Sequence, residues 1–276
     1  MHNLPSVILY HYTSGDGLLG IFGSDTLRAT KIHFMNDYRE FTHATELAKG
    51  HLHGLRAGRK GDSQAQVAAA VAEVIDSFTR LGLFVACFSE DFDSLSQWRG
   101  YCPRSFGYNI GFDGDLLLEI ARAQGFHLRP CIYDRDKQDN QVKDWALETV
   151  TALTTALPKD ADPKDFTQQN CNTAMLKFIG FAPYLKDPCF KDEREWRMVG
   201  HAPSNDPRIA LRSGRSTLVP YLPVQLHSKT ENSPVWEVRV GPTPHPELAM
   251  DAMGQLFNQI KVKNGITRTM LPYRDW

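Results

Sequence analysis

Runs of β-branched and aromatic residues, which predict strands, lie near both ends of this 276-residue sequence, and helical spacing dominates the region between them. The strand-like runs cover residues 7–12 at the start and residues 235–240 and 266–270 at the end. Between residues 65 and 80, valine, isoleucine and phenylalanine recur at helical spacing. Strands at both ends with helices between them favour an α+β fold over a repeating βαβ sheet.

The length of the chain permits one large domain or two small ones. We expect a single α+β domain over residues 1–276, enlarged by helical insertions at about 38–80 and 138–185. The sequence contains no internal repeat and no low-complexity tract. A chain of this size can bury a core without a metal or a disulfide, so any cofactor would serve chemistry rather than folding.

Charge and cysteine content exclude several classes of protein. Lysine and arginine total 31 against 32 aspartate and glutamate residues, and the net charge of 31 − 32 = −1 argues against general affinity for nucleic acid. The five cysteines form no C-x-x-C pair, so neither structural zinc nor a secreted disulfide framework is indicated. Signal-peptide features and apolar tracts of ~20 residues are both absent from the sequence. We therefore expect a cytoplasmic protein without membrane contact.

Glutamate and arginine recur between residues 193 and 197. If this segment is a strand, its period of two places Glu193, Glu195 and Arg197 on one face. Such a face can bind a hydroxyl-bearing ligand and stabilise a developing cation. The alternative is a solvated sheet face with a surface salt bridge.

A histidine between two tyrosines ends the first predicted strand. Tyr10, His11 and Tyr12 are followed by Thr13 and Ser14, where a strand-to-helix turn offers backbone N–H groups and hydroxyls to a ligand. The alternative is a helix N-cap beside a core histidine. Because His11 alternates with the two tyrosines, we expect only one of these sets to face the core.

A short helix is predicted over residues 94–101, with Trp98 and Tyr101 on one face. Aromatic side chains there can stack on a planar heterocycle, and Arg99 can reach a phosphate. The alternative is core packing. The acidic run at residues 90–93 is interpreted as a solvated loop with a helix cap rather than a cation site. No phosphate-loop, dinucleotide, zinc-protease or esterase motif occurs in the sequence, and no metal ligands are predicted.

Several blocks of sequence, taken in their order, resemble the bacterial family catalogued as domain of unknown function 2971. The blocks are residues 9–14, 35–37 with Glu40, 87–90, 97–101, 107–113, 193–197 and 272–274. Their order is also similar to that of a distant ADP-ribosyltransferase. This second resemblance implies a split core of mixed or antiparallel strands and NAD as substrate.

In an ADP-ribosyltransferase, an early histidine contacts the NAD ribose, a middle aromatic stacks on nicotinamide, and a late glutamate is catalytic. The resemblance gives these roles to His11, to one of Tyr12, Tyr38, Trp98 or Tyr101, and to Glu195. The Glu193-x-Glu195 pair resembles the E-x-E signature of some of these enzymes.

The remaining predicted roles concern the acceptor, the ribose and the pyrophosphate. Glu193 would orient or deprotonate the acceptor, Thr13 would hold the ribose with His11, and Arg99 or Arg197 would neutralise the pyrophosphate. Asn36 joins Tyr12 in the expected NAD-binding set.

The leading hypothesis is therefore an NAD-dependent ADP-ribosyltransferase-like enzyme. The resemblance implies a toxin or phage-defence role, with a cognate antitoxin or defence partner; the acceptor, whether protein, nucleic acid, small molecule or water, stays open. One alternative is a non-catalytic module that binds a nucleotide or a protein. The other is a nuclease that holds a divalent ion with Asp113, Glu193 and Glu195.

Overall fold

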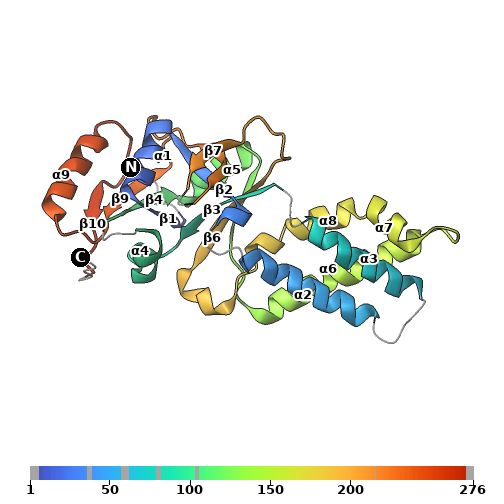
Figure 1. Ribbon diagram of the computed structural model, residues 1–276. Coiled ribbons are helices and arrows are strands. Elements are labelled where there is room, and N and C mark those ends of the chain that lie inside the picture. The colour runs from blue at the N-terminus through green and yellow to red at the C-terminus, as the bar shows by residue number, and fades with distance from the viewer. Residues whose placement is uncertain are drawn as a thin grey trace. The chain divides into compact units, whose positions relative to one another are not determined.

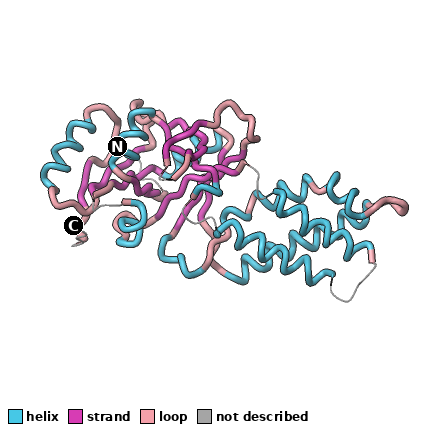
Figure 2. The backbone as a smooth tube through the Cα atoms, viewed as in Figure 1, coloured by secondary structure: helices cyan, strands magenta, loops and turns pink. Residues whose placement is uncertain are grey.

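Two compact units make up the chain, and strands gather in the first of them. The computed structural model describes residues 6–35, 39–56, 62–78, 82–102, 106–214 and 216–271. The first unit combines Met1–Lys31, Leu83–Pro130 and Asp192–Trp276, and the second combines Ile32–Gly82 and Cys131–Lys191. Strands (magenta) and helices (cyan) mix in the first unit, whereas helices dominate the second (Figures 1 and 2). The predicted Asn36 and the block at residues 272–274 lie outside the described residues.

Within the described residues, the strands of the first unit form one ten-stranded sheet. They are β1 (Ile8–Thr13), β2 (Thr26–Lys31), β3 (Leu83–Ser89), β4 (Tyr108–Asp113), β5 (Phe126–Pro130), β6 (Glu195–His201), β7 (Ala210–Ser213), β8 (Leu218–Gln225), β9 (Val235–Val240) and β10 (Ile266–Arg268). The order is β10-β9-β4-β1-β3-β2-β8-β7, and β6 pairs with both β3 and β5. The pair β9–β10 is parallel and the other pairs are antiparallel, so the sheet is mixed. The α+β prediction is confirmed.

The sheet forks at β3. One edge of β3 pairs with β6 along its whole length, from Leu83 to Ser89. Its other edge is divided between two strands: β2 pairs at Phe84 and Val85, and β1 meets β3 at a single pair, Tyr10 with Ser89. On this edge β1 and β3 therefore diverge beside Cys87. Backbone groups of β3 that face the gap must find hydrogen-bond partners other than a neighbouring strand.

Both faces of β1 are packed, and the two tyrosines, but not His11, belong to an apolar cluster, as expected of alternating sets. Leu9 lies in the main core with Phe88 and Phe112. Helices α1 (Gly15–Ser24), α5 (Gly114–Ala123) and α9 (Pro246–Phe257) contribute apolar side chains to this core. On the opposite face, Tyr10 and Tyr12 form a second cluster with Trp98 and Cys102, carried by or next to α4 (Leu95–Tyr101).

The second unit contains α2 (Arg39–Arg56), α3 (Ser63–Phe78), α6 (Arg135–Ala156), α7 (Pro163–Asn170) and α8 (Asn172–Ile179), with short 3-10 turns at Ile32–Phe34 and Ala182–Tyr184. The helices α2, α3 and α6 pack side by side (Figure 1). Trp145 and Phe178 meet in its core with ring centroids 4.7 Å apart. The segments expected as helical insertions fall in this unit; that the two units form one domain stays a prediction.

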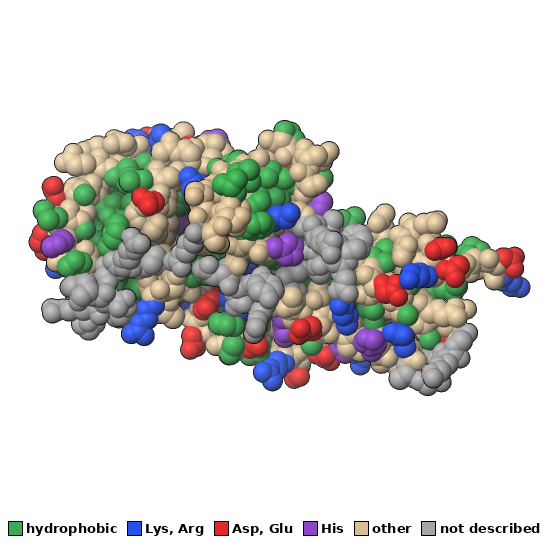
Figure 3. Space-filling model, in the orientation of Figure 1, with side chains coloured by type: hydrophobic (Ala, Val, Ile, Leu, Met, Phe, Trp, Pro, Cys, Tyr) green, Lys and Arg blue, Asp and Glu red, His purple; other side chains and the backbone are tan. Residues whose placement is uncertain are grey.

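Acidic and basic side chains are interspersed on the visible face of the second unit (Figure 3). Within this unit, Lys164 and Glu73 form an exposed ion pair of 2.8 Å. None of the described helices is both long and apolar enough to span a membrane.

Candidate functional site

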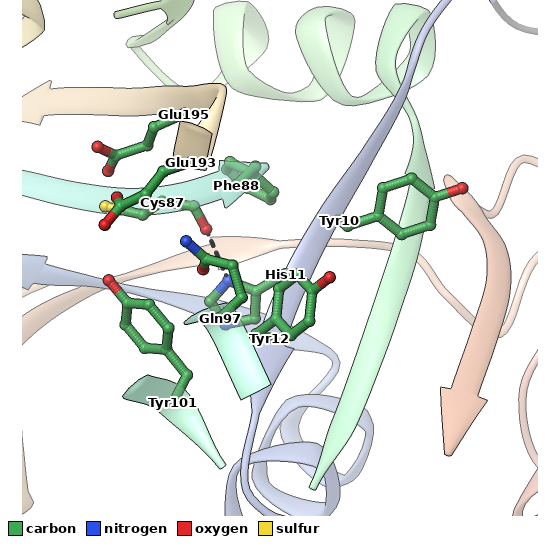
Figure 4. A pocket seen from close by; sticks show the side chains of 9 residues that line it. All are labelled: Tyr10, His11, Tyr12, Cys87, Phe88, Gln97, Tyr101, Glu193 and Glu195. Carbon is green, nitrogen blue, oxygen red and sulfur yellow. Dashed lines mark hydrogen bonds between the residues drawn. The ribbon is translucent and has the colours of Figure 1, made fainter. Parts of the chain in front are cut away.

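A pocket lies where β1 and β3 diverge and β6 begins (Figure 4). It is lined by Tyr10, His11, Tyr12, Cys87, Phe88, Gln97, Tyr101, Glu193 and Glu195. Its space of about 340 Å³, part of it open to solvent, is small for a whole dinucleotide. The lining combines residues from both ends and the middle of the sequence, and it includes five of the predicted catalytic and binding residues: His11, Tyr12, Tyr101, Glu193 and Glu195.

His11 projects from β1 into the fork of the sheet. Its Nδ1 lies 2.9 Å from the carbonyl oxygen of Cys87, a backbone group beside the point where β1 and β3 diverge. Because a carbonyl can only accept, Nδ1 carries a proton, and in the neutral ring Nε2 is an acceptor. Burial lowers the pKa of His11, against the opposing effect of the bond to Cys87, so the neutral form is favoured.

Glu195 is the first residue of β6 and is held by Arg197. The Arg197 Nε and Nη2 atoms donate to Oε1 and Oε2 of Glu195 at 3.1 and 3.0 Å. The two side chains are 5% and 2% exposed, so this is a buried bidentate ion pair. Arg197 does not line the pocket but orients a carboxylate that does, and its role at a pyrophosphate stays a prediction.

The predicted strand alternation is wrong at Glu193. This residue ends a 3-10 turn, Pro188–Glu193, and β6 begins at Glu195. Between them Arg194 adopts a left-handed backbone with φ of 45°, so the chain turns rather than extends. Glu193 and Glu195 still reach one pocket, because the turn, and not a shared strand face, brings the two carboxylates together (Figure 4).

The acidic run at residues 90–93 anchors this turn instead of lying free in solvent. Glu90 accepts hydrogen bonds from Arg194 Nη2 at 2.7 Å and from Trp196 Nε1 at 2.8 Å. The Ser89 hydroxyl donates to the Glu193 carbonyl at 2.6 Å. These contacts hold the left-handed residue in place, so the expectation of a solvated loop is corrected.

Trp98 is a packing residue and does not line the pocket. It is 1% exposed, its ring meets that of Tyr12 edge-on at 4.7 Å, and its Nε1 donates to Asp93 at 2.8 Å. Tyr12 is also fixed, since its hydroxyl donates to the Asp91 carbonyl and accepts from the Ser94 amide. These contacts leave no face of Trp98 for a ligand, which corrects its predicted stacking role.

Tyr101, in contrast, is 40% exposed and lines the pocket. It lies four positions after Gln97 on α4, so both side chains project from the same side of that helix. Three further lining residues were not predicted as such, although they fall in the sequence blocks at 87–90 and 97–101: Cys87, Phe88 and Gln97. A single glutamine carries no motif that would mark it.

The other predicted binding residues are not brought to the pocket. Thr13 ends β1, and Ser14 caps α1 by accepting from the Gly17 amide at 3.1 Å, as the N-cap alternative predicted. Arg99 is exposed on α4 and does not line the pocket. Asn36 lies outside the described residues.

The three carboxylates expected for a metal-dependent nuclease do not converge. Asp113 caps α5 through the amides of Asp115 and Leu116, and its second oxygen lies 3.2 Å from Lys263 Nζ. It is absent from the pocket lining. Among the described residues, no group of three or more acidic, histidine or cysteine side chains is arranged to hold a metal ion.

Residues 97–198 match the model of a family described as protein of unknown function (DUF2971). Over this segment the chain is similar to the DUF2971 family. No curated protein and no solved structure matches the chain. The matched segment begins at Gln97 and ends just after Arg197, so the DUF2971 region contributes Gln97, Tyr101, Glu193 and Glu195 to the pocket. His11 and Cys87 come from the part of the chain that precedes it.

Proposed function

We propose that the pocket binds the nicotinamide–ribose end of NAD and that the protein transfers or hydrolyses ADP-ribose. The observation that carries the proposal is that His11, Tyr101, Glu193 and Glu195, which are distant in sequence, line one pocket. The lining supplies an aromatic ring, an acceptor nitrogen and two carboxylates. These are the groups that a planar heterocycle, a ribose and a developing positive charge require.

Glu195 is the group that we expect to stabilise the reaction. Cleavage of the bond between the ribose C1′ and the nicotinamide nitrogen leaves the electron pair on nicotinamide and gives the ribose oxocarbenium character. A carboxylate fixed beside that ribose lowers the energy of the transition state more than that of bound NAD. The bidentate contact with Arg197 fixes Glu195 in advance, so no reorientation is needed.

The other lining residues complete the chemistry. His11 Nε2 accepts from a ribose hydroxyl, since Nδ1 already donates to the Cys87 carbonyl. Glu193 removes the proton of the acceptor hydroxyl or amine as the acceptor bonds to C1′. The Tyr101 ring packs against nicotinamide. The pyrophosphate and adenosine lie outside this small pocket.

The cellular setting rests on the sequence resemblance and on the cysteines. We assign the activity to the cytoplasm, because the described cysteines are free thiols, as a reducing compartment maintains them. The toxin or phage-defence role and the cognate antitoxin or defence partner follow from the resemblance to ADP-ribosyltransferases. The acceptor can be a protein, a nucleic acid, a small molecule or water.

The test is nicotinamide release from NAD by the purified full chain and its Glu195→Gln variant. We expect release by the wild type and at least a ~100-fold loss in the variant, since one electrostatic stabiliser contributes that much to kcat. Far-ultraviolet circular dichroism establishes that the variant is folded. Absence of NAD binding by the wild type, or equal turnover by the two proteins, would overturn the proposal.

A second candidate is a non-catalytic module that binds the same end of NAD or a related nucleotide. The observation that favours it is that Arg197 already engages both oxygens of Glu195. Calorimetry separates the two functions: a binding module gives saturable NAD binding by wild type and Glu195→Gln alike, with no nicotinamide released by either.

A further inference from the structure

Gln97 places a buried carboxamide at the wall of the pocket. Gln97 is 7% exposed and lines the pocket together with Tyr101, four positions later on α4. The side chains of His11, Cys87 and Glu193 line the same pocket (Figure 4). Gln97 is thus a polar group in a position to touch whatever occupies the space.

The Gln97 amide has no hydrogen-bond partner among the described residues. Its nitrogen and oxygen appear neither in a hydrogen bond nor among the fully enclosed atoms that lack one. The contrast is with Gln138, whose side chain is equally buried but donates to the carbonyls of Ile132 and Lys186. A buried carboxamide without a protein partner must bind water or a ligand, because leaving it unsatisfied costs about 1–3 kcal/mol.

The charge of the lining selects the kind of group that can meet Gln97. Glu193 and Glu195 are acidic, His11 is favoured in its neutral form, and among the described residues no lysine or arginine lines the pocket. A ligand carboxylate would therefore face Glu193 and the Arg197-bound Glu195 without a cationic lining residue. A neutral carboxamide has no such cost, and it can pair with Gln97 through one N–H···O bond in each direction.

We infer that Gln97 recognises the carboxamide of the pyridine ring, so that the pocket accepts NAD and rejects its carboxylate analogue, deamido-NAD. This inference rests on the proposed function. Gln97 lies one turn before Tyr101 on α4. A pyridine ring packed on Tyr101 can therefore present its carboxamide to Gln97. Gln97 is then a specificity residue, and the chemistry of bond cleavage stays with Glu195.

The experiment measures kcat/KM for NAD and for deamido-NAD, with Gln97→Met and Ser96→Ala as variants of α4. Methionine keeps the volume of the side chain but removes its hydrogen bonds, and Ser96 is exposed on the same helix. We expect the wild type and Ser96→Ala to prefer NAD by about tenfold or more. In Gln97→Met the preference should fall several-fold, through a higher KM for NAD with little change in kcat.

Binding of both dinucleotides to Glu195→Gln, measured by calorimetry, distinguishes a failure of the proposed function from a failure of the inference about Gln97. Wild-type protein that neither binds nor cleaves NAD would overturn the proposed function and the inference with it. Cleavage of NAD with the same preference in wild type and Gln97→Met would overturn the inference alone. Thermal melting of Gln97→Met, with NAD cleavage retained, establishes that the variant is folded.

Discussion

Arg197 binds both carboxylate oxygens of Glu195, and the two side chains are almost entirely shielded from water. The same spacing occurs in a second pair, in which Arg208 binds Asp206 through Nε and Nη2, but the Arg208 side chain is 56% exposed. These two pairs are thus a buried and an exposed version of the same bidentate contact. Their difference tests what burial contributes.

Replacing Arg197 by methionine should destabilise the protein by about 3–5 kcal/mol, because it leaves the Glu195 carboxylate buried without its partner. Arg208→Met is the matched control and should cost less than about 1 kcal/mol. Urea unfolding measures both values. The double variant Glu195→Gln/Arg197→Met should recover part of the loss, since the uncompensated charge is removed. Equal costs at Arg197 and Arg208 would contradict the buried ion pair.

Stability should depend on pH through His11. Burial lowers the pKa of His11 from its usual value of 6.5, so the unfolded chain binds a proton that the folded protein does not. This contribution to stability is complete above pH 6.5 and is lost as the pH falls from there towards the lowered pKa. Urea unfolding between pH 5 and pH 8 should therefore show a smaller dependence on pH in His11→Asn than in the wild type.

His201→Asn is the control for this measurement, because His201 is an exposed residue at the end of β6. It should keep the dependence on pH of the wild type. If nicotinamide release requires neutral His11, the rate should also fall in acid, below the lowered pKa. If the wild type and His11→Asn had the same dependence of stability on pH, the lowered pKa of His11 would be refuted.

Trp98→Phe should lower stability by about 1–3 kcal/mol, because Asp93 loses its hydrogen bond from Nε1. Asp93 also accepts from the Thr269 hydroxyl at 2.6 Å and from the Met270 amide at 3.2 Å. The double-mutant cycle with Asp93→Asn measures the coupling. Additive effects would show that the contact between Trp98 and Asp93 contributes nothing of its own.

Tyr101→Ala should raise KM for NAD about tenfold or more and leave the melting temperature within a few degrees of the wild type, since the ring is 40% exposed. Trp98→Ala gives the opposite pattern, a loss of about 3–5 kcal/mol typical of a buried aromatic residue. Steady-state kinetics and thermal melting on the two variants decide which aromatic meets the ligand. An unchanged KM in Tyr101→Ala would show that the Tyr101 ring does not contact NAD.

Local patterns predicted most of the regular elements. The strand predicted at residues 235–240 is β9, and the helix predicted over residues 94–101 corresponds to α4, Leu95–Tyr101. Two of the missed strands, β5 and β7, are short; β5 ends in a proline, and β7 alternates partly buried and exposed residues. The helix α5 was not predicted, although Asp113 caps it by accepting from its first amides.

The prediction that Glu193, Glu195 and Arg197 share one face relies on the strand period of two, which the chain interrupts at Arg194. Alternation over residues 193–197 requires extended backbone, but Arg194 is left-handed, and no local pattern marks an arginine for that conformation. The choice among aromatic residues depended on burial, which spacing does not determine: Trp98 and Tyr101 share α4, yet their exposed fractions are 1% and 40%. Gln97 can be recognised as a lining residue only when the side chains around it in the structure are known.

The pocket exists because the main chains of β1 and β3 diverge. Two strands that meet at one residue pair leave a gap between their backbones. His11 closes one side of this gap by bonding to the Cys87 carbonyl. Exchanging a lining side chain alters the chemistry of this gap but not its existence. Relatives that keep the same branching of strands can thus evolve new ligands at an unchanged location.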